Sequence, residues 1–237
     1  MKTILIWVTF LSFLFSNGLN ILTPSQVQAR LSIVNGYSAE CVMHKFYIGT
    51  GWIQLEGEVG RNGIDGLYFK KKKGVIREVL VAESKWNKSR LGLSGKKKTV
   101  RQMSKEWVIR TLDRLQKYKP LPEYGTIKKL VMADQYRARL FRLKPVGKDK
   151  IQIHIYRIKN KGMKSFDTFN ESSLKPITIG SPKNDFERGI LESYDRCRTE
   201  ALRKYFPMLS EVEIRVLLQD NYLQKKDMKR IFIEAGK

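Results

Sequence analysis

Apolar and polar residues alternate along the first half of the chain in ways that predict both helices and strands. A helix is predicted over residues 36–48, where apolar residues form one stripe. Residues 64–70 and 75–84 are two β-prone runs separated by a tight Lys-Gly turn, which is typical of an antiparallel hairpin. The clearest 3.6-residue period covers residues 99–118 and ends before Pro120.

The second half of the chain begins with strands and ends with helices. Residues 126–133 have the apolar character of a third buried strand, and residues 151–158 alternate apolar and polar side chains as a half-exposed strand does. Residues 160–183 form a polar connector. From Asn184 onward the pattern is helical, and residues 210–213 form a capping box that opens a helix.

The N-terminal residues have the order of a secretory signal peptide. Lys2 precedes an apolar run over residues 4–15, and Val27-Gln28-Ala29 carries small residues at the spacing that signal peptidase reads. The apolar run is shorter than the ~20 residues of a spanning helix. We therefore expect cleavage after Ala29, no stable membrane anchor, and a secreted or periplasmic protein; a retained N-terminal anchor is the alternative.

After a signal peptide over residues 1–29, the elements predict two units. Residues 30–180 are expected to form an α/β domain, and residues 181–237 a helical C-terminal segment. The composition, with 42% hydrophobic and 11% aromatic residues, excludes a wholly disordered chain. Two cysteines and two histidines are too few for a zinc ribbon.

The charge is strongly unbalanced, because 46 Lys and Arg residues face 23 Asp and Glu residues, for a formal net charge of +23. An excess of this size opposes compaction, and a polyanionic partner such as nucleic acid or an anionic membrane explains it. A merely soluble basic protein is the alternative. In an oxidising compartment Cys41 and Cys197 could form a disulfide; two buried free thiols are equally compatible with the sequence.

Two acids and a lysine are predicted to meet at the open end of the hairpin. If the hairpin turns at Gly74, the residue numbers of cross-strand partners sum to about 148, which places Asp65 opposite Glu83. Lys85 lies two residues further along and shares their face. Two close carboxylates repel unless a cation lies between them, and oxygen ligands at a strand end suit Mg²⁺. A structural ion-paired trio is the alternative.

These residues resemble the signature of the PD-(D/E)XK, or restriction-endonuclease-like, nuclease superfamily. The spacing of that signature is matched by Asp65 and Glu83-Ser84-Lys85, with the β-hairpin between them. Gly63-Ile64-Asp65-Gly66 matches the Gly-Ile-Asp form of the first motif, with Ile64 where proline also occurs. Residues 101–107 resemble the glutamine-containing motif that opens the helix after the Glu-X-Lys strand. The likeness covers about residues 36–160 and is closest to the toxin and DNA-repair subset.

The resemblance implies a restriction-endonuclease-like core, with a helix, a mixed β-sheet with a central hairpin, a helix and a strand, to which the C-terminal helical segment is appended. Asp65 and Glu83 would bind Mg²⁺, for which Mn²⁺ would substitute, and Lys85 would serve the attacking water. Glu40, on the preceding helix, would assist the metal site. Gln102 would position the site or a backbone phosphate.

Basic residues and one tryptophan near these motifs are expected to contact the phosphate backbone without reading its sequence. They are Lys71, Lys72, Lys73, Trp86, Lys96, Lys97, Lys98 and Arg101.

Together these features predict an exported, Mg²⁺-dependent deoxyribonuclease with little sequence preference, acting as a toxin or as a scavenger of DNA. A toxin would have an acidic inhibitor protein as a partner. A non-enzymatic cationic module that coats DNA is the alternative from another class, and an RNase is the third possibility, because a metal site alone does not distinguish the two backbones.

Overall fold

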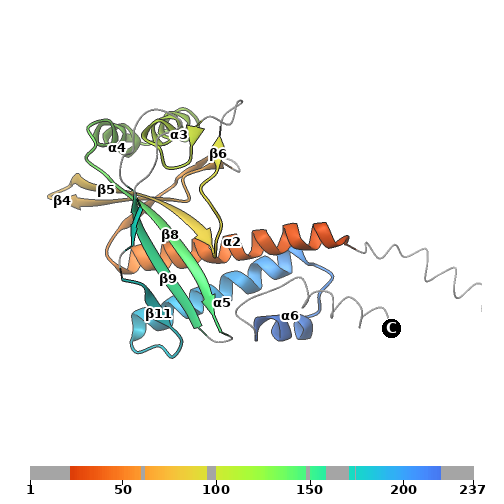
Figure 1. Ribbon diagram of the computed structural model, residues 1–237. Coiled ribbons are helices and arrows are strands. Elements are labelled where there is room, and N and C mark those ends of the chain that lie inside the picture. The colour runs from red at the N-terminus through yellow and green to blue at the C-terminus, as the bar shows by residue number, and fades with distance from the viewer. Residues whose placement is uncertain are drawn as a thin grey trace, which may run out of the picture.

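A computed structural model describes residues 22–59, 62–94, 100–147, 150–158, 171–173 and 175–219. They form a mixed α/β fold around one seven-stranded sheet (Figure 1). Its strands run in the order β1-β4-β5-β8-β9-β10, and β11 also pairs with β9. β8 is parallel to β5, and the other pairs are antiparallel. The α/β class predicted from the sequence is confirmed.

The strands of the sheet are β1 Ile53–Leu55, β4 Gly66–Lys72, β5 Val75–Trp86, β8 Arg137–Val146, β9 Lys150–Ile158, β10 Glu171–Ser173 and β11 Ile177–Ile179. Two small ribbons lie outside it: β2 Glu58–Val59 with β3 Asn62–Gly63, and β6 Leu93–Ser94 with β7 Val100–Arg101. The helices are α2 Pro24–Gly49, α3 Lys105–Tyr118, α4 Pro122–Met132, α5 Asp185–Tyr205 and α6 Glu211–Leu218.

The predicted hairpin and its register are confirmed by β4 and β5. Gly66 pairs with Ala82 and Leu67 with Val81, which is the predicted register, and it holds as far as Lys70. A shift between Lys70 and Lys71 then leads into the turn. Lys73 and Gly74 both have positive φ there, 53° and 76°, as the two central residues of a type I′ turn do.

Helices cover both faces of the sheet, α3 and α4 on one and α2 and α5 on the other (Figure 1). Residues of β4, β5 and β8 alternate between the two cores because successive strand side chains point to opposite faces. The core beneath α3 and α4 includes Leu67, Val81, Leu140, Trp107, Leu112 and Ile127. The core beneath α2 and α5 includes Tyr68, Leu80, Phe141, Val42, Phe46 and Tyr194.

The strand predicted over residues 126–133 is wrong, because this segment belongs to α4. Pro122 begins the helix, and Tyr124, Ile127 and Val131 are buried at helical spacing. Pro at the first helical position is favoured, since its missing N–H would have no partner there. The next strand is instead β8, which the sequence pattern did not reveal.

The helix predicted over residues 99–118 begins later, at Lys105. Ser104 caps it, its side chain accepting a hydrogen bond from the amide of Trp107. The residues before the cap form β7 and a turn in which Met103 has φ 70°. Gln102 therefore precedes the helix rather than opening it.

The polar connector predicted over residues 160–183 contains strands in its described part, because β10 and β11 both pair with β9. The half-exposed strand predicted over residues 151–158 is confirmed by β9, where Ile151, Ile153 and Ile155 are buried.

α2 extends the helix predicted over residues 36–48 toward the N-terminus. It begins with a capping box between Thr23 and Gln26, and Val27, Leu31 and Val34 pack against residues that include Leu202, Phe206, Leu209 and Ile214. The predicted cleavage point after Ala29 therefore lies inside α2, whereas the apolar run over residues 4–15 lies outside the described residues. No helix in the described part of the chain is long and apolar enough to cross a membrane.

The residues beyond position 180 are packed into the same structure. α5 begins after its cap Asn184, and its residues Ile190 and Tyr194 join the core formed by α2 and the sheet. The capping box at residues 210–213 is confirmed, and it opens α6. The predicted boundary near residue 180 therefore does not separate two hydrophobic cores within the described residues.

Candidate active site

The candidate site lies where β4 and β5 separate. Asp65 directly precedes β4, while Glu83 and Lys85 lie on the neighbouring part of β5. Ile64 is fully buried, and its amide donates a hydrogen bond to the Gly57 carbonyl at 2.8 Å. Proline at position 64 could not make this hydrogen bond, so Ile64 anchors the turn that presents Asp65.

Gly66 is required by close packing on the other side of Asp65. A Cβ atom there would lie 2.5 Å from the ring of Tyr68 and 2.9 Å from the end of Met43. Non-bonded carbon atoms prefer separations of about 3.5–4.0 Å. The Ile-Asp-Gly sequence therefore places Asp65 between a buried anchor and a position without room for a side chain.

Asp65, Glu83 and Lys85 are brought together as the sequence predicted. Asp65 Oδ2 accepts hydrogen bonds from the amide of Ser84 at 2.9 Å and from its hydroxyl at 3.0 Å. Lys85 Nζ donates to Glu83 Oε1 at 2.7 Å. Glu83 is only 1% exposed, and its other oxygen, Oε2, has no hydrogen-bond partner among the described residues.

Burial and mutual repulsion make these carboxylates hard to ionise. The pKa of Glu83 is raised to about 8, first by its burial and then by the charge of Asp65, while Lys85 opposes the rise. The pKa of Asp65 is raised by burial, with Lys85 acting against it and Glu40 adding to it. Ionisation of both acids would place two negative charges beside the single positive charge of Lys85.

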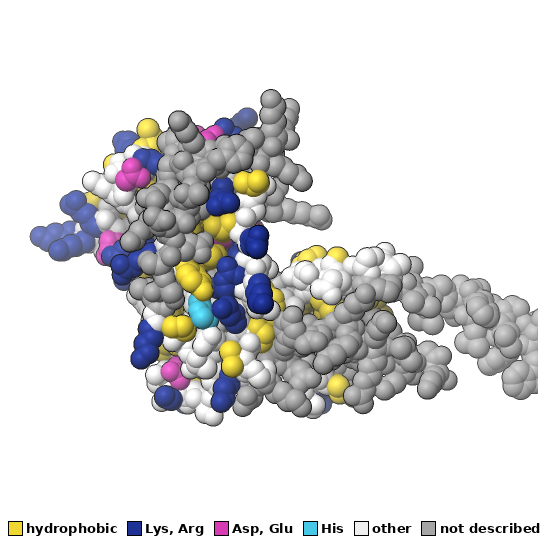
Figure 2. Space-filling view, viewed as in Figure 1, with side chains coloured by type: hydrophobic (Ala, Val, Ile, Leu, Met, Phe, Trp, Pro, Cys, Tyr) yellow, Lys and Arg dark blue, Asp and Glu magenta, His cyan; other side chains and the backbone are white. Residues whose placement is uncertain are grey.

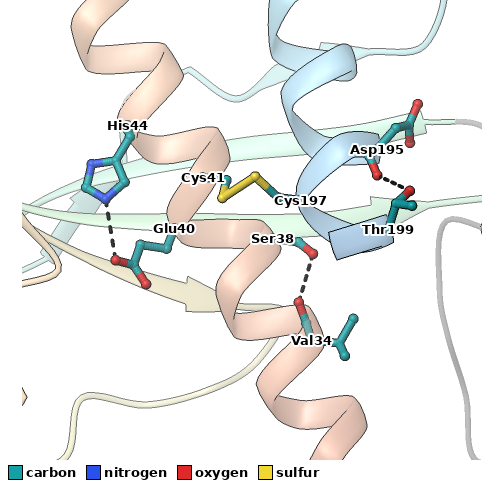
Figure 3. The surroundings of a disulfide bond; sticks show 8 residues. All are labelled: Val34, Ser38, Glu40, Cys41, His44, Asp195, Cys197 and Thr199. Carbon is teal, nitrogen blue, oxygen red and sulfur yellow. Dashed lines mark hydrogen bonds and ion pairs between the residues drawn. A yellow bond between two sulfur atoms is a disulfide. The ribbon is translucent and has the colours of Figure 1, made fainter. Parts of the chain in front are cut away.

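Glu40 approaches this pair from α2, as predicted. Its carboxylate adds to the rise of the pKa at both Asp65 and Glu83. Glu40 Oε1 lies 3.4 Å from His44 Nε2, and His44 Nδ1 lies 2.7 Å from the Tyr68 hydroxyl. Figure 3 shows both side chains on the side of α2 away from the disulfide. His44 therefore links Glu40 to the sheet.

Glu58 is a further acid that was not predicted from the sequence. Its pKa is raised by burial and by the charges of Glu40 and Asp65, which places it in the same electrostatic cluster, while His44 lowers it. It lies on β2, in the turn region between β1 and β4. Glu58 is close in sequence to the Gly-Ile-Asp motif, which could have made it a candidate. The sequence alone, however, does not show that the turn carrying Glu58 folds back toward Asp65.

Gln102 contacts the loop that follows β5. Its side-chain oxygen accepts a hydrogen bond from the amide of Gly92 at 2.6 Å, and its own amide donates to the Gly92 carbonyl at 2.9 Å. These contacts hold the 87–92 loop. Its predicted role toward a phosphate stays a prediction.

The predicted phosphate-binding residues are dispersed. Lys71, Lys72 and Lys73 lie at the hairpin turn, which is at the far end of β4 from Asp65, about 23 Å away for seven residues of extended chain. They cannot rim the site. Trp86 is only 9% exposed and stacks on Tyr194 of α5 with centroids 6.3 Å apart, so it is a core residue and not a surface for substrate.

Of the remaining predicted contacts, Arg101 is the one that lies within the described residues. Arg101 is half-buried on β7, next to Gln102. Lys96, Lys97 and Lys98 lie outside the described residues.

The sequence did not decide whether Cys41 and Cys197 are bonded or free. In the structure they form a disulfide between α2 and α5, with their Cα atoms 6.5 Å apart (Figure 3). Cys41 directly follows Glu40. The bond therefore ties the part of α2 that carries Glu40 and His44 to α5.

The donor chemistry fits a magnesium ion. The carboxylates of Asp65 and Glu83 offer only oxygen, and the unpartnered Glu83 Oε2 is an available ligand. No three His, Cys, Asp or Glu side chains in the described ranges are grouped closely enough to hold a metal alone. Mg²⁺ is commonly held by one or two carboxylates, with waters and substrate phosphates as the other ligands, so two carboxylates suffice.

Comparisons with protein-family models, with curated proteins and with solved structures find no match for this chain. What the site can do is therefore inferred from the chemistry of its own side chains. Two repelling acids and a lysine at a strand end, with a third acid on a helix behind them, form an arrangement suited to a divalent cation and a phosphate.

Proposed function

We propose that this protein is a metal-dependent nuclease of the PD-(D/E)XK type that hydrolyses DNA with little sequence preference. The observation that carries the proposal is Glu83, a buried carboxylate with an unpartnered oxygen, beside Asp65 and in contact with Lys85. Burying charge without compensation is costly, and raised pKa values cluster at functional sites. In this proposal the unpartnered Oε2 is the atom that would bind the metal ion.

The order of elements supports the restriction-endonuclease-like core. α2 precedes the β4–β5 hairpin, α3 follows it, and β8 then pairs in parallel with β5. The order differs from the predicted helix, hairpin, helix and strand in one respect, because α4 takes the place of the strand predicted over residues 126–133 and the strand comes later, as β8.

Each side chain has a role in this proposal. Asp65 and Glu83 would hold Mg²⁺, which when bound neutralises charge on the phosphodiester and acidifies a coordinated water. Lys85 keeps Glu83 Oε1 in place and presents its ammonium group toward the attacking water or the phosphate. Ser84 orients Asp65 through its two hydrogen bonds. Glu40, held by His44, acts through the waters of the metal site.

We also propose that the protein is exported, to the periplasm or the exterior. The Cys41–Cys197 bond supports this, because disulfides persist in oxidising compartments, and so does the apolar run over residues 4–15. Cleavage after Ala29 would remove the Thr23 cap and the buried Val27 from α2, so the structure favours export with this part of α2 retained. An exported DNase would act as a toxin, with an acidic inhibitor protein as its partner, or as a scavenger.

The test is cleavage of plasmid DNA by the purified protein with Mg²⁺ and with a chelator. Asp65→Asn and Lys85→Ala should each lower the rate by about 10³-fold, since removing one catalytic group or charge-stabilising donor costs about 10²–10⁴-fold. Lys72→Ala, at the other end of the hairpin, and Glu192→Gln, exposed on α5, are the controls and should retain the rate within about twofold. Full activity of Asp65→Asn would refute the site.

The same assay separates the alternatives. A cationic coating module would bind DNA without cutting it under any divalent metal. An RNase would degrade RNA and leave duplex and single-stranded DNA intact under conditions in which Asp65→Asn abolishes RNA cleavage.

A further inference from the structure

The face of the sheet that carries Glu83 continues past α3 and α4 onto β8 and β9. Across these strands Glu83 pairs with Leu140, Lys85 with Arg142, and Arg142 with His154. Paired residues point to the same side of a sheet. Leu140 lies in the core under α3 and α4, whereas Lys85, Arg142 and His154 stay partly exposed.

These side chains form a row that begins at the catalytic acids. Neighbouring strands lie about 4.8 Å apart, so Lys85, Arg142 and His154 span about 10 Å across three strands. Lys144 lies two residues beyond Arg142 on β8, on the same face, opposite Gln152. We call Lys85, Arg142, Lys144 and His154 the basic face. Figure 2 shows several Lys and Arg side chains gathered on this side of the molecule, near a histidine.

Lys85 is paired with Glu83, but the charges of Arg142 and Lys144 are not neutralised by a neighbouring acid. Arg142 donates its hydrogen bonds to the backbone carbonyls of Asn87 and Ser89, not to an acid. Within the described ranges, no carboxylate forms an ion pair with Arg142 or Lys144. Burial lowers the pKa of His154, and the charges of Lys144 and Arg142 lower it further.

The loop after β5 adds two cations beside this face. Arg142 holds the loop against β8 through Asn87 and Ser89, and the amide of Asn87 donates to the Leu143 carbonyl at 2.8 Å. Lys88 and Arg90 on this loop are exposed. Cations from this loop, added beside the row on β5, β8 and β9, are suited to a polyanion.

We propose that the basic face binds the backbone phosphates of a nucleic-acid strand and leads that strand to Asp65 and Glu83. This inference rests on the proposed nuclease function and names the surface that delivers its substrate. It replaces the hairpin lysines that the sequence suggested. The contacts are to phosphates, so they are independent of base sequence and weaken with salt.

The test is fluorescence anisotropy with a labelled 20-base-pair duplex, in chelator and in an Asp65→Asn background, so that no DNA is cut. Lys144→Glu is compared with Lys72→Glu, which makes the same charge change at the hairpin turn. Lys144→Glu should raise the Kd at least about fivefold and lower the salt slope by about one, as loss of a phosphate contact does. Lys72→Glu should raise the Kd less than about twofold.

A thermal melt of each variant checks folding, and Lys144→Gln, which adds no negative charge, should show a smaller loss of the same kind. Equal effects of Lys144→Glu and Lys72→Glu would overturn the proposal. So would a Lys144→Glu variant that loses binding to phosphatidylserine vesicles but keeps binding to the duplex, because the face would then be a membrane surface.

Failure of the two proposals can be told apart. If the wild-type protein cuts DNA and Lys144→Glu binds it normally, the basic face is wrong and the nuclease stands. If the wild-type protein never cuts but Lys144→Glu loses duplex binding, the surface stands and the nuclease is wrong.

Discussion

The two ends of the β4–β5 hairpin carry charge in opposite ways. At the turn, Lys71, Lys72 and Lys73 are exposed to solvent, and Lys71 Nζ lies 3.4 Å from Glu123 Oε1. At the open end, Asp65 and Glu83 lie close together in a buried setting with raised pKa values. Solvated charges contribute little to the free energy of folding, whereas buried acids of the same sign oppose it.

The difference teaches which charges indicate function. A run of lysines at a turn is tolerated at almost no free-energy cost and therefore needs no function to explain it. A buried pair of carboxylates lowers stability, and it persists where the activity requires it. Within this hairpin the acids are the informative residues, although the lysines are more conspicuous in the sequence.

The largest expected effect is a loss of stability on removal of the disulfide, which supports the open end of the hairpin. We call this end, where Asp65 and Glu83 lie, the acid end. Replacing Cys41 and Cys197 by serine removes a cross-link between residues 156 positions apart. The chain-entropy model assigns such a loop about 5 kcal/mol of stability. Urea unfolding should show a loss approaching this value. Hydrogen exchange should accelerate in residues 80–86, behind which α2 lies, more than at the hairpin turn.

Wild-type protein treated with reductant is the matched comparison for the double serine variant, and it should behave in the same way. A loss below about 1 kcal/mol, or faster exchange confined to the turn, would contradict the view that the disulfide braces the acid end.

The next prediction compares how two acids on β5, Glu83 and Glu78, affect the stability of the fold at different pH values. The pKa of Glu83 in the folded protein is about 8, above its ordinary value of 4.5. Folding therefore favours the protonated form, and stability is lost as the pH rises from about 4.5 to about 8. Glu83→Gln is always neutral, so in chelator it should be more stable than wild type at pH 9, by on the order of 2 kcal/mol, and about equal at pH 4.5.

Glu78→Gln is the control near the hairpin turn, where Glu78 forms an exposed ion pair with Arg137. Exposed pairs contribute about 0.2–1 kcal/mol, so this variant should be slightly less stable than wild type. Urea unfolding of the two variants and the wild type at pH 4.5 and pH 9 measures these differences in stability. Destabilisation of Glu83→Gln at pH 9 would mean that the Glu83 carboxylate stabilises the fold, as in a structural ion pair.

The register of the hairpin could be predicted from the sequence because it is a local property. One turn at Gly74 and a period of two determine which residues face each other, and Asp65, Glu83 and Lys85 follow from that count. Glu40 came only from the resemblance to the PD-(D/E)XK superfamily, because the residue pattern alone does not show which side of the helix faces the hairpin.

Other features depend on tertiary packing and could not be predicted in this way. The short apolar run in α4 is compatible with a strand or a helix, and packing against α3 selects the helix. His44 and Glu58 reach the acids only because α2 and the β2 turn fold against the hairpin. The basic face joins residues of β5, β8 and β9, whose order in the sheet no short-range pattern reveals.

The smallest effect tests how tightly the acid end is packed, using two glycines. Gly66→Ala adds a methyl group that would meet Tyr68 and Met43, whereas Gly125 on α4 has nothing within 4 Å of an added Cβ. Overpacking typically costs 1–3 kcal/mol, so Gly66→Ala should lose about 1–2 kcal/mol in urea unfolding. Gly125→Ala should gain about 0.5–1 kcal/mol, since alanine favours a helix. A neutral Gly66→Ala with an unchanged cleavage rate would mean that Asp65 is not held by close packing, and the rigidity attributed to the acid end would be lost.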